Sequence, residues 1–382
     1  MFRLILSGIV FTVVGLLQQA CTTLPTELKD AHIGSPGKVL VDHSLRREQA
    51  NNLDQLCNSR GSPVDPITEV EGPSGYGLDT RYELARSAMI NMGTGCLSGS
   101  VSQCKSIIEM MTNWALANAA QVKSFGNKDD SVYWNDTLTV NLRVVRPFLG
   151  AYSIAKATIN PTTETDVLIR EWMKRTVKRA SHLMRNEGKY RRGGANGRPK
   201  AAHNHAAASA AAWMAYGAMW GDQTAFKYGL DQWFITLGSM RGDGSFPIET
   251  RRGARALFYT GRILSVLMSI AEMAKTQEID LYAHSPTEEK TIHRAVQFML
   301  DALENNELVI KYASENYWPG PHKDYHNQDL GGSGSTFGWI YPYVSRFPNH
   351  PNSARIRKLP YWGLSLCGEW IGTCSKCLYY SE

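Results

Sequence analysis

The chain has 382 residues, of which 43 % are hydrophobic and 20 % are charged, close to the averages of globular proteins. These values exclude a chain that is disordered throughout, and the lack of long apolar runs after residue 17 excludes a multi-pass membrane protein. The formal net charge of +6 suits a polyanionic partner without identifying one.

Residues 1–20 have the pattern of an export signal, with Arg3 as the positive charge and an apolar stretch at residues 4–17. Cys21 follows a small residue, as at the cleavage site of bacterial lipoproteins, although Gln18 stands where an aliphatic residue is usual. We therefore expect an exported bacterial protein, either periplasmic or anchored to the membrane through a lipid on Cys21. A single uncleaved membrane anchor is the alternative.

Six further cysteines can form disulfides in an exported protein. Pairing of Cys57 with Cys96 or Cys104 is plausible, and so is a loop within the C-terminal three, Cys367, Cys374 and Cys377. The Cys-x-x-Cys spacing of the last two lacks a second pair or a suitably spaced His. A structural disulfide or free thiols are therefore favoured there over a metal site.

Residues 21–75 have little periodicity and are rich in Pro, Gly, Ser and Asn, which predicts a tether and an irregular N-terminal segment. Between residues 76 and 358, apolar residues recur at helical spacing. The clearest predicted helices are 81–92, 104–122, 136–158, 164–186, 203–219, 223–238, 253–275 and 286–305. We expect an all-α domain whose paired helices close a toroid or an incomplete toroid, and a plain bundle fits the pattern as well.

The C-terminal part of the chain has a different amino-acid composition. Residues 310–350 are rich in Tyr, Trp, Pro, Gly and His, which indicates a long functional loop region with residues 331–335 as a flexible lid. Residues 359–382 form a Cys-containing tail, for which the sequence predicts no role.

Residues 203–205, His-Asn-His, open a helix that is very rich in Ala. Because Ala permits close packing, this helix is expected to be buried, with its anion-favouring N-terminus supplemented by polar donors. The alternative is an ordinary N-cap with solvated His side chains.

A second motif follows the turn at Asp243-Gly244. Arg252, Arg255 and Tyr259 stand at positions i, i+3 and i+7, which predicts one face of a helix. Two guanidinium groups and a phenol on one face make a carboxylate-binding surface with an acid or base attached. The alternative is a face held by salt bridges to Glu249.

Aromatic and polar residues around Trp134 and Asn135 suggest a sugar platform, or else simple packing. His322 with His326, and His203 with His205, lack a third ligand at a recognisable spacing, so no metal site is predicted. The sequence also has no phosphate-binding Gly loop. We expect no cofactor and no nucleic-acid partner.

Together these segments resemble the mannuronate-type alginate lyases, whose fold is an (α/α) toroid. Residues 203–205 are similar to the family's Asn-Asn-His, and residues 249–259 to its Glu-x-x-Arg-Gly-x-Arg-Ala-Leu-x-Tyr. Residues 339–343, Trp-Ile-Tyr-Pro-Tyr, are similar to its Trp-Leu-Glu-Pro-Tyr, and Asn135 and Arg143 give a weaker match. The resemblance covers roughly residues 80–350.

The chain departs from the family pattern at several places. His203 stands for an Asn, Ala207 and Ala208 replace an aromatic pair, and Tyr341 stands for a Glu. These departures concern the choice of substrate more than the chemistry. A lyase for glucuronan or another uronate polymer is therefore the alternative to one for polymannuronate.

The resemblance implies cleavage by β-elimination, which leaves a 4,5-unsaturated uronate end. Arg252, Asn204 and His205 would neutralise the C5 carboxylate, and Tyr259 would transfer the proton, helped by a guanidinium that favours its deprotonated form. His205 would be the base where the proton and the leaving group lie on opposite faces. The residues expected to bind substrate are His203, Arg255, Asn135, Arg143, Trp339 and Tyr343.

Two other classes compete with a lyase. A glycoside hydrolase needs two carboxylates, for which Asp243 and Glu249 are the obvious pair. A non-catalytic uronan-binding lipoprotein would keep the basic and aromatic residues without needing Tyr259. In every case the expected partner is an acidic polysaccharide, and we expect a monomer.

Overall fold

In a computed structural model, the chain is described at residues 24–40, 57–68, 80–121, 140–186, 202–315, 324–368 and 372–379. The α-helices are α1 (Thr26–Lys29), α3 (Thr80–Leu97), α4 (Val101–Leu116), α6 (Arg146–Lys156), α7 (Thr163–Asn186), α8 (Asn204–Trp220), α9 (Gln223–Gly238), α10 (Ala256–Lys275), α11 (Ile292–Glu304), α12 (Glu307–Ala313), α13 (Ser333–Phe337), α14 (Ile340–Arg346), α15 (Pro351–Ile356) and α16 (Ser375–Tyr379). A π-helix, η2 (Asn141–Val145), and two 3₁₀-helices, η4 (Gly253–Arg255) and η5 (Leu281–Ala283), complete them. The described residues contain no strand, which confirms the all-α prediction.

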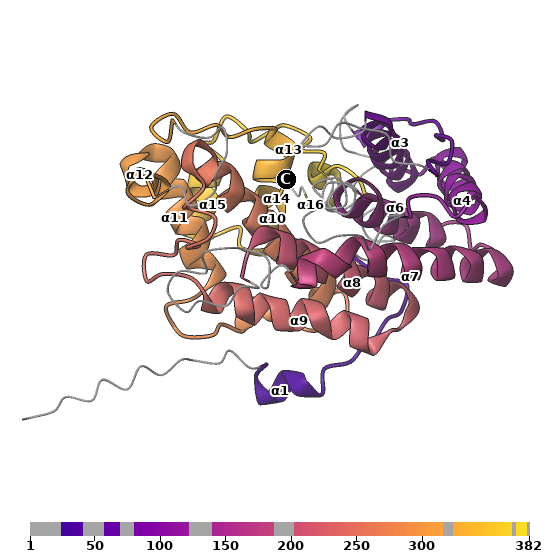
Figure 1. The fold of residues 1–382 in the computed structure, drawn as a ribbon, viewed down its shortest axis with the longest axis horizontal. Coiled ribbons are helices and arrows are strands. Elements are labelled where there is room, and N and C mark those ends of the chain that lie inside the picture. Colours follow the sequence, from indigo (N-terminus) through magenta and orange to yellow (C-terminus); the bar gives the residue numbers. More distant parts are fainter. Residues whose placement is uncertain are drawn as a thin grey trace, which may run out of the picture.

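Several helices that follow one another in the chain pack against each other, among them α3 with α4, α7 with α8, and α8 with α9 (Figure 1). Helix α8 ends at Gly221, which has a left-handed φ of 77°, and Asp222 then caps α9 by accepting a hydrogen bond from Ala225 N. This short turn reverses the chain. A Cβ atom at Gly217 would lie 2.5 Å from Phe226 N, so α8 and α9 approach too closely for a larger residue there.

Helices α8 and α10 form the centre of the core and pack against each other. Every residue of α8 except Trp220 is buried, and in α10 only Phe258 and Lys275 are not. The stretch Gly253–Lys275 is long and apolar enough to cross a membrane, but 94 % of its apolar 18-residue segment is buried within the protein. Its apolar character is therefore that of a core helix.

The N-terminal segment packs against the helical domain where it is described. Ile33 N donates to Gln223 Oε1 over 3.0 Å, and Gly37 N donates to Ala218 O over 2.9 Å. Val39 is 1 % exposed. Residues 24–40 are thus held on α8 and α9.

The disulfides differ in part from the expected pairing. Cys96 pairs with Cys104 across the turn between α3 and α4, and Cys367 pairs with Cys374. Cys57 pairs with Cys377, so its expected bond to Cys96 or Cys104 is wrong. The loop within the C-terminal three is confirmed.

The C-terminal tail enters the domain beside α3 and α6. Gly93 of α3 faces Gly372 O so closely that no Cβ fits between them, and Thr373 Oγ1 lies 2.9 Å from Thr94 Oγ1. The tail and the N-terminal segment are therefore tied together at the Cys57–Cys377 bond.

Residues 310–350 contain short helices where a long loop was expected. Gly331, at a φ of +58°, turns the chain against the Phe258 ring, and Ser333 starts α13, which packs on α10. Residues 331–335 therefore form a turn and the start of a short helix in the segment that was expected to be a flexible lid. Helix α11 starts later than predicted because the Thr291 hydroxyl caps it by accepting from Arg294 N.

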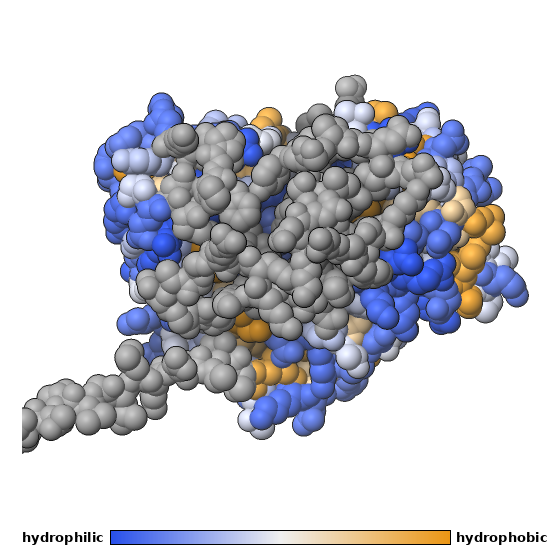
Figure 2. Space-filling model, viewed as in Figure 1, coloured by the Kyte–Doolittle hydropathy of each residue, from blue (hydrophilic) through white to orange (hydrophobic). Residues whose placement is uncertain are grey.

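Polar and charged side chains cover much of the described surface in the view of Figure 2. Apolar side chains gather at its right edge, beside α4. The most exposed large apolar residues include Leu84 of α3, with Val101 and Leu116 of α4.

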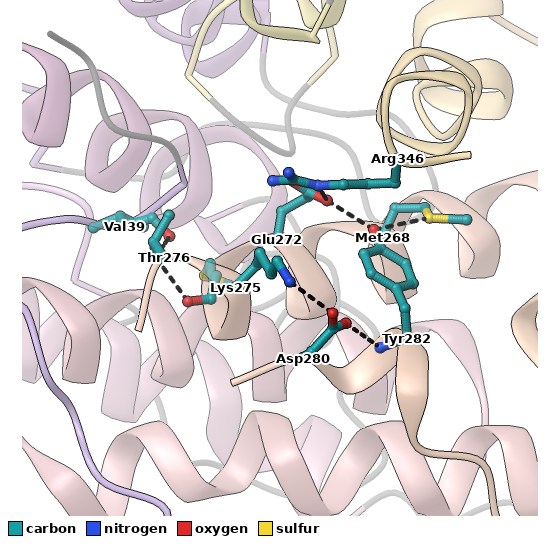
Figure 3. A network of polar contacts seen from close by, with 9 residues as sticks. Val39, Met268, Glu272, Lys275, Thr276, Asp280, Tyr282 and Arg346 are labelled. Carbon is teal, nitrogen blue, oxygen red and sulfur yellow. Dashed lines mark hydrogen bonds and ion pairs between the residues drawn. The ribbon is translucent and has the colours of Figure 1, made fainter. Parts of the chain in front are cut away.

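A polar network holds the end of α10 to α14 (Figure 3). The Glu272 carboxylate, fully buried, accepts two hydrogen bonds from the Arg346 guanidinium at 2.9 and 2.7 Å, and a third from Tyr282 Oη at 2.9 Å. Burial and the Glu272 carboxylate raise the pKa of Tyr282 well above its usual value. The network therefore keeps one buried charge fully paired.

Replacement of Arg346 by Met is expected to lower the free energy of unfolding by about 2–4 kcal/mol, because it leaves a buried carboxylate with a single phenol partner. Urea titration followed by circular dichroism measures this change. In the double variant Arg346→Met/Glu272→Gln, part of the loss is expected to return. An unchanged unfolding midpoint in Arg346→Met would contradict the role of the pair.

Candidate active site

The start of α8 presents three buried polar side chains. His203, Asn204 and His205 are 1 %, 2 % and 8 % exposed. His203 is the N-cap, and its Nδ1 accepts a hydrogen bond from Ala206 N over 3.3 Å. The neutral ring must then carry its proton on Nε2. The N-cap alternative is right about the cap, whereas the His side chains are buried and not solvated.

Glu249 reaches α8 from the loop that precedes α10. Its carboxylate, 0 % exposed, accepts from Asn204 N over 2.7 Å and from Asn204 Nδ2 over 2.8 Å. The alternative expectation for Glu249 was a salt bridge to the Arg residues of its own motif. The structure instead shows these two hydrogen bonds to Asn204, which we call the Glu249–Asn204 clamp. Glu249 belongs to the motif at residues 249–259, but no pattern in the sequence indicates that its partner lies on α8.

Arg252 and Tyr259 form the second part of the site. The guanidinium carbon of Arg252 lies 3.8 Å from the centroid of the Tyr259 ring, and the two residues are 2 % and 8 % exposed. Arg252 follows Glu249 by three positions, so their Cα atoms lie within about 10 Å of each other. The loop therefore connects the residue that binds Asn204 to the residue that stacks on Tyr259.

The expected single face of Arg252, Arg255 and Tyr259 is wrong. Gly253 has a φ of +56°, and the α-helix begins only at Ala256. Because this backbone turn breaks the helical register, Arg252 folds back on Tyr259 while Arg255 Nε pairs with Asp329 Oδ2 at 2.9 Å. The Arg255 side chain is 38 % exposed.

Three of the other residues expected to bind substrate have protein partners of their own. Arg143 Nε pairs with Glu83 Oε2 at 2.9 Å. Trp339 is fully buried, and its indole N–H donates to Thr336 O. Tyr343 is also fully buried, with its hydroxyl 2.7 Å from His293 Nδ1. Asn135 lies outside the described residues.

A separate polar cavity of about 450 Å³ lies at the start of α11. His293 and His350, which help to line it, stack with their ring centroids 4.4 Å apart. Both Nδ1 atoms lie within hydrogen-bond distance of Tyr343 Oη. Burial, with a smaller effect of His350, lowers the pKa of His293 to about 4, and burial lowers that of His350.

These shifts predict acid sensitivity. Below the ordinary His pKa of 6.5, the unfolded chain binds protons that folded His293 does not bind until about pH 4. The free energy of unfolding should therefore fall as the pH drops through this window. Because the ring is only half-buried, we expect about 1 kcal/mol from His293, and a shallower loss in His293→Asn. Urea unfolding midpoints of the natural protein and of His293→Asn, measured at pH 7 and pH 4.5, test this. An equal fall in the midpoint for both proteins between the two pH values would contradict it.

Comparison with known proteins places the fold in a family. A family model described as alginate lyase matches residues 85–309, more than half of the chain. This chain belongs to the alginate lyase family. An alginate lyase of Azotobacter vinelandii is 27 % identical over 159 residues, which are 42 % of this chain and 39 % of that relative. The match thus spans less than half of the relative's length.

Solved structures of alginate lyases cover nearly the whole chain. Alginate lyase A1-III from Sphingomonas species A1 has a TM-score of 0.69 at 21 % identity, covering 93 % of this chain and 99 % of that one. A variant of alginate lyase A1-III complexed with a tetrasaccharide gives 0.72 with the same identity and coverage. An alginate lyase from Bacteroides ovatus gives 0.55 at 15 % identity, covering 89 % and 92 %. The expected (α/α) toroid is confirmed.

Proposed function

We propose that this protein cleaves a uronate polymer, with alginate as its substrate, by β-elimination. The observation that carries the proposal is the buried Arg252–Tyr259 stack, within an alginate-lyase fold. Arg252 follows by three positions the Glu249 that binds the first residue of α8. A buried cation next to a phenol suits a substrate whose acidic proton lies beside a carboxylate. The tetrasaccharide complex of a relative supports a site for oligosaccharides in this fold.

The reaction breaks the C5–H and C4–O bonds and forms a C4–C5 double bond, without consuming water. Loss of the C5 proton moves charge onto the carboxylate, so Arg252, Asn204 and His205 would bind the developing dianion. In mannuronate linkages the proton and the leaving oxygen lie on one face. Tyr259 could then take the proton from C5 and return it to the C4 oxygen.

Polymannuronate is the substrate that the family resemblance favours. In guluronate linkages the proton and the leaving oxygen lie on opposite faces, which would require His205 as base and Tyr259 as acid. Glucuronan is the second candidate, since the chain departs from the family pattern at His203, Ala207 and Tyr341.

The test is ultraviolet absorbance of the new unsaturated end, with purified protein mixed separately with polymannuronate, polyguluronate and glucuronan. An increase in absorbance with polymannuronate supports the full proposal. An increase with another polymer alone supports a lyase and identifies a different substrate. A flat trace with new reducing ends would indicate a hydrolase. Retention on the polymer without new ends would indicate a binding protein.

The cellular setting is part of the proposal. Residues 1–20 would direct export, and Cys21 would carry the lipid of a periplasmic lipoprotein that acts as a monomer. Both segments lie outside the described residues. Metabolic labelling with a radioactive fatty acid, compared between the natural chain and Cys21→Ser, distinguishes a lipoprotein from a free periplasmic protein.

A further inference from the structure

Glu249 and Asn204 lie 45 residues apart in the sequence and share two hydrogen bonds at 2.7 and 2.8 Å. Both side chains are buried, at 0 % and 2 % exposed. We propose that Glu249 is a positioning residue, whose carboxylate fixes the Asn204 amide so that its free N–H faces the substrate carboxylate. The inference rests on the proposed lyase function.

The orientation follows from the chemistry of the two groups. An ionised carboxylate only accepts hydrogen bonds, so the Asn204 side chain must turn its nitrogen toward Glu249. Distances of 2.7 and 2.8 Å are those of N–H donors on a carboxylate. Nδ2 carries two hydrogens, and the clamp uses one. The second stays available as the donor that the proposed mechanism assigns to Asn204.

The clamp also joins the two parts of the site. One of its two hydrogen bonds is donated by the backbone N–H of Asn204, the first residue of α8. The first N–H groups of a helix lack a partner within the helix, so Glu249 supplies one. From Glu249 the chain runs directly to Arg252, where Gly253 reverses it onto Tyr259. A buried carboxylate without partners would be unstable, and the two N–H donors of Asn204 supply them.

Glu249→Gln removes the charge with almost no change in shape. The side-chain oxygen of the introduced Gln can still accept a hydrogen bond from Asn204 N. The side-chain nitrogen of this Gln then faces the Asn204 side chain, and as a donor it needs the Asn204 side-chain oxygen as its acceptor. Asn204 would turn its amide over, and the substrate would lose its donor. We expect kcat to fall about 10- to 100-fold, with a smaller change in KM.

A double-mutant cycle separates positioning from a structural role. If Glu249 acts through Asn204, Glu249→Gln should add little to the loss caused by Asn204→Ala. The matched control is Glu272→Gln, another fully buried Glu, which binds Arg346 and Tyr282 away from this site. It should lower the melting temperature and leave kcat unchanged. If Glu249→Gln does not fold, Glu249→Asp retains the charge on a shorter side chain and should lose about tenfold in kcat.

Hydrogen exchange of the Asn204 side-chain amide, followed by NMR, gives a readout without turnover. The amide should exchange slowly in the natural protein and faster in Glu249→Gln. Unchanged exchange, unchanged kcat, or a loss that simply adds to that of Asn204→Ala would each overturn the inference. If the natural protein cleaves no uronan at all, the proposed function fails, while the exchange measurement still decides whether Glu249 orients Asn204.

Discussion

Replacement of Tyr259 by Phe is expected to lower kcat by about 10²–10⁴-fold, because the phenol is the proposed proton-transfer group. The ring itself remains, so the Arg252 guanidinium at 3.8 Å keeps its stacking partner. Binding of the polymer should therefore survive, since the groups that neutralise the carboxylate are untouched. The change is expected in kcat far more than in KM.

Turnover is measured from the absorbance of unsaturated ends, and binding by isothermal titration with a uronate oligosaccharide. Tyr282→Phe is the matched control, because its hydroxyl bonds Glu272 at the far end of α10. This variant should lose stability while keeping its kcat. Near-natural turnover in Tyr259→Phe would show that another group moves the proton.

Replacement of Arg252 by Lys has the second largest expected effect, a fall in kcat/KM of about 10²–10³-fold. Lys keeps the charge but loses the planar group that lies over Tyr259 and can bind a carboxylate through two parallel hydrogen bonds. Because Arg252 binds the carboxylate before and during the reaction, both KM and kcat should worsen.

The neighbouring Arg251 provides the control. Its Nε pairs with Glu315 Oε2 at 2.6 Å, so Arg251→Lys makes the same chemical change at a residue engaged elsewhere. Steady-state kinetics of both variants on the preferred polymer should show a large loss for Arg252→Lys alone. Equal losses would mean that the loop, and not the Arg252 guanidinium, carries the effect.

Helices with strong apolar periodicity could be predicted from the sequence. The expected ranges 164–186 and 223–238 agree within one residue with α7 and α9. The short helices α13 and α14 could not be predicted, because their few residues are rich in Gly, Pro and aromatics. Their helical state depends on packing against α10 and the tail, which local sequence does not encode.

The site could be predicted in part. Residues 203–205 and Arg252 with Tyr259 are identified from their motifs, and all five are buried in the structure. The separation of Arg255 depends on the left-handed backbone at Gly253, which a fixed helical spacing ignores. Likewise, the Glu249–Asn204 clamp and the Cys57–Cys377 bond join segments 45 and 320 residues apart. Such partners follow from the tertiary fold and not from spacing.

The central claim is that this site removes the C5 proton and expels the C4 oxygen without adding water. Mass spectrometry of the products from a defined uronate tetrasaccharide tests it most directly. The account predicts two fragments whose masses sum to that of the substrate, one of them unsaturated, and cleavage by Tyr259→Phe that is about 10²–10⁴-fold slower. Fragments whose masses sum to the substrate plus one water would contradict it.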